Sequence, residues 1–193
     1  MSKHNDMKSV FWNRKMKALE NPTEYSSAYL SGLIGENEGR KWLTDSGYEV
    51  FEFEWISFYF LSIERTLERL RRRRKPEYKE YDKSIIANIE KFLKGIFRER
   101  YEVTRQFFAS IHQPRKELHK KRSRDKPDFI IKKNNDFALV EVKANQSMLT
   151  TGQRECFKIA KSHGIKAFTL KVVVETNVVK EISLLEYNQE YLK

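Results

Sequence analysis

The chain lacks the features that mark secreted and membrane proteins. Cys156 is the one cysteine among 193 residues, so no disulfide can form within the chain. No run of about 18 apolar residues occurs, and the first residues lack the apolar stretch of a signal peptide. These absences predict a soluble, intracellular protein of the cytoplasm that makes no use of a membrane.

Zinc ligands are also scarce. Four scattered histidines and one cysteine give no zinc-binding spacing, so any bound metal would be held by oxygen atoms. Cys156 has no histidine nearby to activate it, and we expect it to be a small buried residue rather than a nucleophile. We likewise assign Trp12, Trp42 and Trp55 to the core rather than to base stacking.

The composition is that of a folded protein: 39% of the residues are hydrophobic and 13% are aromatic. A chain of this length is enough for one domain with its own core and hardly enough for two. We therefore expect a single domain over residues 1–193 that carries an insertion.

The net charge of +11 is concentrated in the middle of the chain. Residues 55–127 hold 21 lysines and arginines against 10 acidic residues, and the remainder of the chain is balanced. Such a stretch attracts polyanions, and phosphate backbones are the usual ones. The alternative is a solvated helical face in a charge-rich protein. Four consecutive arginines, residues 71–74, are harder to explain in that way, because they cannot all be paired internally.

Helical periodicity dominates the first two thirds of the sequence. We expect helices over residues 7–19, 26–45, 58–75 and 85–111, with Pro76 stopping the third and Pro114 ending the fourth. Residues 48–55 alternate apolar and acidic side chains and predict a first strand. Residues 58–113 would then form a helical hairpin inserted after this strand, and residues 114–127 a basic connector.

A period of two follows in the last third of the chain. Strands are predicted over residues 128–132 and 137–144, joined by a tight turn at Asn134 and Asn135. A helix over residues 152–163 and strands over residues 167–175 and 178–185 complete the pattern. This order predicts an α/β fold with a central mixed sheet flanked by helices.

Two acidic residues and a lysine converge on the predicted hairpin. Glu141 and Lys143 are two apart on one strand, so their side chains emerge on one face while Val142 points to the other. Asp128 begins the paired strand and comes opposite the neighbourhood of Glu141. Two adjacent carboxylates repel unless a cation lies between them, and an oxygen-only site suits Mg²⁺. Lys143 could lie beside a water bound to that metal.

These residues carry a family resemblance. Pro127 and Asp128, followed by Glu141-Val142-Lys143, resemble the signature of the PD-(D/E)XK nucleases. The closest likeness is to the virus-type replication-repair nucleases and archaeal Holliday junction resolvases. The resemblance implies a restriction-endonuclease-like fold and an Mg²⁺-dependent DNA endonuclease, with Mn²⁺ as a substitute. The sequence departs from the family pattern by its long insertion between the first strand and Asp128.

The resemblance also implies roles for single residues. Asp128 and Glu141 would be metal ligands, with the Val142 carbonyl as a further one, and Lys143 would orient the water. Gln153 would be the glutamine of the following helix, against the alternative of a solvated polar residue. Glu36 matches a helix glutamate that serves as an additional ligand. Independently, its spacing from apolar neighbours predicts that it faces the sheet, and Glu38 is its competitor.

The expected substrate is DNA, cut by structure (junctions, flaps or mismatches) in repair or recombination, because no module for reading base edges is evident. Two alternatives stay open: a non-catalytic DNA-binding or scaffold protein with this fold, and an RNA nuclease. Whether the chain acts as a homodimer is also open. The expected DNA contacts are Arg71, Arg72, Arg73, Arg74, Lys120, Lys121, Arg122 and Arg124.

Overall fold

The computed structural model describes residues 20, 23, 25–72, 75–112 and 126–187. Within them the chain forms an α/β fold, in which helices flank a five-stranded mixed sheet in the order β1-β2-β3-β4-β5. All neighbouring strands pair antiparallel except β3 and β4, which pair parallel. The elements are α2 (Ser27–Asp45), β1 (Glu49–Glu52), α3 (Phe53–Arg72), α4 (Pro76–Phe97), η2 (Arg98–Arg100), α5 (Tyr101–His112), β2 (Phe129–Lys133), β3 (Asp136–Ala144), α6 (Thr151–Ser162), β4 (Lys166–Glu175) and β5 (Val178–Glu186).

Helices cover both faces of the sheet. On one face α2 places Leu43 against Val140 and Leu170 in one apolar cluster. On the other face Phe157 of α6 packs with Leu139 in a second cluster, which α3 and α5 also join. This layered arrangement is the predicted α/β core.

The strands around the hairpin follow the sequence pattern closely. Lys133 pairs with Asp136 across a two-residue turn, and Asn134 at its start has a φ of 58°, a conformation that asparagine tolerates well. β3 is buried over nearly all of its length, as expected for a strand with apolar layers on both sides. β3 is therefore the central strand of the sheet.

The first strand is shorter than its sequence predicts. β1 ends at Glu52, and Phe53, predicted to belong to the strand, begins α3 instead. The backbone N–H of Phe53 donates to the carbonyl of Asp128 at 3.0 Å. Phe53, Ile56, Phe60 and Ile63 are buried at helical spacing, so the burial of this helical face overrides the strand-like alternation.

The helices after β1 also differ from their predicted bounds. α3 ends at Arg72, before Pro76 as expected, but the next helix begins at Pro76 and not at residue 85. Pro76 takes the first helical position of α4, where its missing N–H costs no hydrogen bond. The long helix predicted over residues 85–111 is interrupted by η2 and continues as α5. Arg98, with a φ of 46°, marks this break. Among the described residues between β1 and β2, three α-helices and η2 therefore take the place of the two helices expected.

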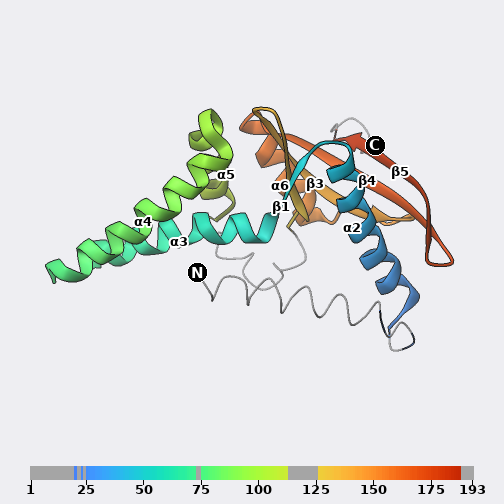
Figure 1. Ribbon diagram of the computed structural model, residues 1–193, viewed down its shortest axis with the longest axis horizontal. Coiled ribbons are helices and arrows are strands. Elements are labelled where there is room, and N and C mark those ends of the chain that lie inside the picture. Colours follow the sequence, from blue (N-terminus) through green and yellow to red (C-terminus); the bar gives the residue numbers. More distant parts are fainter. Residues whose placement is uncertain (1–19, 21–22, 24, 73–74, 113–125, 188–193) are drawn as a thin grey trace.

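In Figure 1, α3 and α4 lie side by side and extend away from the sheet, whereas α5 returns toward it. The helix predicted over residues 7–19 and most of the basic connector at residues 114–127 lie outside the described residues. Among the described residues, no helix has both the length and the apolar character needed to cross a membrane.

Candidate active site

Asp128 and Glu141 meet where the β2–β3 ladder ends. Phe129 pairs with Val140, and one further step in this antiparallel register places Asp128 opposite Glu141. The Asp128 carboxylate accepts a hydrogen bond from the backbone N–H of Val142 at 2.8 Å. The Asp128 side chain thus replaces the backbone acceptor that the next strand pair would supply to Val142, and this hydrogen bond holds the carboxylate against β3.

Glu141 is a buried acid whose two oxygens differ in their surroundings. Its residue is 3% exposed. Oε1 lies 2.8 Å from the Lys143 ammonium and accepts a hydrogen bond from the Gln153 side-chain amide at 2.5 Å. Oε2 is buried and receives no hydrogen bond from a donor among the described residues. Glu141 Oε2 is therefore an acceptor that is shielded from water and has no donor among the described residues. Such an atom lowers the stability of the fold unless another group binds it.

Burial is the main influence on the pKa values of these two acids. Burial raises the pKa of Asp128 well above its ordinary value, and the charges of Glu141 and then Glu36 raise it further. Burial also raises the pKa of Glu141, and the neighbouring Lys143 opposes this rise. The protein thus disfavours two negative charges at this point, which a proton or a bound cation would offset.

Gln153 has two tasks at the start of α6. Its side-chain oxygen accepts from the backbone N–H of Thr150 at 2.9 Å, and the Thr150 hydroxyl accepts from the backbone N–H of Gln153 at 3.2 Å. This reciprocal capping box fixes the amide, so that its nitrogen can reach Glu141. The alternative of a solvated residue is excluded, because Gln153 is 4% exposed.

Two glycines bring α2 close to the sheet beside these acids. A Cβ at Gly35 would lie 3.3 Å from the Ala144 Cβ, and one at Gly39 would lie 2.7 Å from a Leu170 methyl group. Glu36 follows Gly35, is partly buried, and lies near enough to Asp128 for its charge to raise the pKa of that acid. Glu38 is also partly buried, and its carboxylate accepts from the Asn37 side chain at 3.4 Å.

The described residues contain no group of three or more histidine, cysteine, aspartate or glutamate side chains arranged to hold a metal ion. The acids that do converge are a close pair, Asp128 and Glu141, with Glu36 at longer range. A pair of carboxylates completed by water and substrate oxygens is a donor set that suits Mg²⁺.

Of the eight predicted DNA contacts, Arg71 and Arg72 fall within the described residues. Both are exposed at the end of α3, where Arg72 also pairs with Glu68 one helical turn earlier. The other six, Arg73, Arg74, Lys120, Lys121, Arg122 and Arg124, lie outside the described residues.

Cys156 is buried on α6, and burial raises the pKa of its thiol to about 12, which disfavours the reactive thiolate. Trp42 and Trp55 are partly buried and pack against the two apolar clusters, in keeping with a core role, whereas Trp12 lies outside the described residues.

Two polar residues of this region escaped the sequence analysis. Thr150 caps α6, and the spacing Thr-x-x-Gln, which is typical of a capping box, could have identified it. Lys171 lies opposite Lys143 in the parallel β3–β4 register, and its ammonium lies 3.4 Å from the Ser147 carbonyl. No local pattern identifies Lys171, because the pairing of β3 with β4 is set by tertiary structure.

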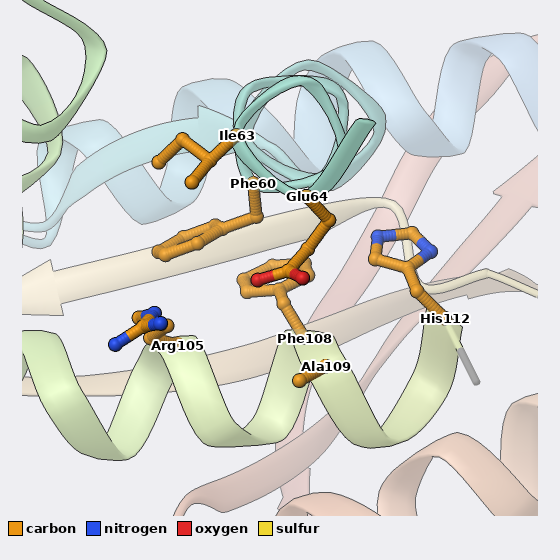
Figure 2. Close-up of a pocket in the computed structure, with 7 residues that line it drawn as sticks. All are labelled: Phe60, Ile63, Glu64, Arg105, Phe108, Ala109 and His112. Atoms are coloured by element: carbon orange, nitrogen blue, oxygen red, sulfur yellow. The ribbon is translucent and has the colours of Figure 1, made fainter. Parts of the chain in front are cut away.

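A pocket lies elsewhere, between α3 and α5 (Figure 2). Its lining is mainly apolar, with Glu64, Arg105 and His112 as the polar members. None of the predicted site residues lines it, so the acidic pair and this pocket are separate features. The lining residues are Phe60, Ile63, Glu64, Arg105, Phe108, Ala109 and His112.

Comparison with known proteins adds no relative: no family model, no curated protein and no solved structure matches this chain.

Proposed function

We propose that this chain is a metal-dependent nuclease of the PD-(D/E)XK kind that hydrolyses DNA phosphodiester bonds, with Mg²⁺ as cofactor and Mn²⁺ as a substitute. The observation that carries the proposal is the buried Oε2 of Glu141, which has no donor among the described residues and lies on the strand position opposite a second carboxyl group, Asp128. Burial raises the pKa of both acids, and the charge of Glu141 raises that of Asp128 further, so a bound cation would stabilise the charged forms.

The donor set fits Mg²⁺. Asp128 and Glu141 would hold the ion, and the Val142 carbonyl is a further candidate. The N–H of Val142 points to the edge where Asp128 binds it, and the N–H and carbonyl of one strand residue point to the same side. When bound, the ion supplies an activated water and polarises a phosphoryl oxygen.

The surrounding residues then have distinct tasks. Lys143 places a positive charge beside Glu141, where it can orient the attacking water and offset charge that develops on the phosphate. Gln153 holds the Glu141 carboxylate through Oε1 and so leaves Oε2 to the cation. Glu36 would add a carboxylate from α2, and Glu38 competes for this role.

DNA is the proposed substrate because the basic excess lies in residues 55–127, beside the segment that carries Asp128. We further propose a restriction-endonuclease-like arrangement of the sheet, in which the segment between β1 and β2 contacts the DNA backbone. Such contacts position a substrate without reading its sequence, which favours cleavage selected by DNA structure, as in repair or recombination.

The test is cleavage of labelled duplex, single-strand, flap and four-way junction DNA with Mg²⁺ or Mn²⁺. Asp128→Ala, Glu141→Ala and Lys143→Ala should each lower the cleavage rate at least roughly a hundredfold, with little loss of DNA binding. EDTA should stop the reaction. Lys180→Ala and Glu181→Ala, at exposed positions of β5, are matched controls and should cleave as the wild type does.

The outcomes separate the alternatives. If Lys143→Ala cleaved DNA at the wild-type rate, the assignment of Asp128, Glu141 and Lys143 as the active site would be wrong. DNA binding without cleavage of any substrate would favour a scaffold protein, and cleavage of RNA alone would favour an RNA nuclease. For the metal site, Glu36→Gln should require more Mg²⁺ than the wild type and Glu38→Gln should not. If both variants needed no more Mg²⁺ than the wild type, α2 would not contribute a ligand to the site.

A further inference from the structure

Two stacked tyrosines stand exposed at the beginning of α2. The ring centroids of Tyr25 and Tyr29 are 5.4 Å apart with an interplanar angle of 24°, and the two residues are 38% and 47% exposed. Tyr29 is held in place, because its backbone N–H donates to the side chain of the N-cap residue Ser26 at 3.3 Å. Large aromatic rings that stack outside the core leave apolar ring surface available to another planar group.

The tyrosine pair lies on the same stripe of α2 as Glu36. Tyr29, Gly32 and Glu36 are separated by three and four residues, the spacing that aligns side chains along one face of a helix. Tyr29 and Glu36 are therefore roughly 10 Å apart along the helix axis. Glu36 in turn follows Gly35, and a Cβ at Gly35 would lie 3.3 Å from the Cβ of Ala144, on the strand that carries Glu141.

Gly32 leaves the path between them open. It is exposed, and a Cβ built on it would meet nothing within 4 Å. By contrast, Gly35 and Gly39 on the inner face are needed for close packing against the sheet. The stripe thus runs from an aromatic platform, past a position without a side chain, to the edge of the acidic pair.

We propose that Tyr25 and Tyr29 form a stacking platform for an unpaired base of the DNA strand whose phosphate lies at Asp128 and Glu141. This inference rests on the proposed nuclease function and specifies its substrate class. Stacking on aromatic rings is tolerant of sequence, since every base has a π-face. A base inside a duplex is covered by its neighbours, so the platform selects single-stranded, frayed or flap DNA.

The test measures binding separately from cleavage. A single-stranded oligonucleotide that contains the fluorescent base 2-aminopurine, and a duplex of the same sequence, are titrated with the full chain in EDTA. Tyr29→Ala should bind the single strand about tenfold more weakly and leave duplex binding within about twofold. Tyr29→Phe keeps the ring and should bind as the wild type does. Tyr81→Ala removes a tyrosine that is 66% exposed on α4 and is the matched control.

A second variant guards against a folding defect. Gly32→Leu places a side chain on the open path while it improves the helix propensity of α2, so it should weaken single-strand binding in a stable protein. Wild-type binding of the single strand by both Tyr29→Ala and Gly32→Leu would overturn the platform. An equal loss of single-strand and duplex affinity in Tyr29→Ala would also overturn the platform. The same holds if Tyr29→Ala binds the single strand normally but no longer associates with a second copy of the chain, because the tyrosines would then contact protein and not DNA.

The two proposals can fail separately. If the wild type cleaves DNA but Tyr29→Ala binds the single strand normally, the nuclease stands and the platform does not. If the oligonucleotide binds through Tyr29 but no DNA is cleaved under any metal condition, the nuclease assignment fails and the binding site remains.

Discussion

Asp82 in the helical arm formed by α3 and α4 and Glu141 at the end of the β2–β3 ladder are both buried acids, but their surroundings differ. The Asp82 side chain is fully buried and accepts two hydrogen bonds from the Arg69 guanidinium, at 2.5 and 3.2 Å. Glu141 binds Gln153 and Lys143 through Oε1, whereas its Oε2 has no hydrogen-bond partner among the described residues, and a second acid, Asp128, lies opposite it.

The comparison separates a structural acid from a candidate functional one. A bidentate guanidinium neutralises Asp82 and joins α3 to α4, so its charge is satisfied within the fold. At the sheet, burial and then the charges of Glu141 and Glu36 raise the pKa of Asp128, so the fold disfavours the charged form of this acid unless a ligand compensates it. Burial of an acid is therefore no guide to function until its partners are known.

The largest effect on stability is expected in the arm. Asp82→Ala leaves the Arg69 guanidinium without its carboxylate and removes a buried side chain, which should lower the free energy of unfolding by roughly 1–3 kcal/mol. Urea denaturation measures this loss. The rate of DNA cleavage per folded molecule should stay that of the wild type, because the arm is not part of the acidic pair.

A matched change at the sheet gives the opposite pattern. Glu141→Gln keeps the size of the side chain and should abolish cleavage with a smaller change in unfolding free energy than Asp82→Ala. If Asp82→Ala also abolished cleavage in the folded protein, the distinction between the two buried acids would be wrong.

The difference between the two regions also explains what the sequence could predict. The hairpin was predictable because strand alternation, the Asn134–Asn135 turn and the positions of Asp128 and Glu141 are all local. The pair of α3 and α4 was harder, since the role of Pro76 and the start of α3 at Phe53 depend on which face becomes buried.

Long-range partners were beyond sequence reasoning. The Arg69–Asp82 pair needs α3 and α4 to be aligned, and the position of Lys171 beside Lys143 needs the parallel register of β3 and β4. The close approach of α2 to the sheet likewise depends on Gly35 and Gly39 meeting particular side chains. The residue types of the site were therefore predictable, whereas the packing that holds them was not.

A smaller effect is expected at the capping box, where stability and chemistry can be separated. Gln153→Ala removes both the cap and the amide that binds Oε1 of Glu141, so it should cost about 1 kcal/mol of stability and lower cleavage about tenfold. Thr150→Ala removes the hydroxyl acceptor but keeps that amide.

Thr150→Ala should therefore lose a similar amount of stability and retain most of the cleavage rate. Thermal unfolding and single-turnover cleavage measure the two quantities on the same samples. Equal loss of cleavage in both variants would mean that Gln153 acts through the helix start and not through Glu141.

The smallest effect is expected from the exposed arginines at the end of α3, and it concerns affinity alone. Each phosphate contact contributes a slope of roughly −0.9 to log affinity against log salt concentration. Arg71 is exposed and Arg72 shares its charge with Glu68, so Arg71→Ser should flatten the slope by up to about 0.9 and Arg72→Ser by less. Filter binding to a junction DNA across a salt series measures both slopes, and Lys83→Ser, an exposed lysine of α4 paired with Glu80, is the control.

An unchanged slope in Arg71→Ser would place this end of α3 in solvent away from the DNA. A lower cleavage rate of this variant at saturating DNA would contradict the separation of binding in the arm from chemistry at the sheet.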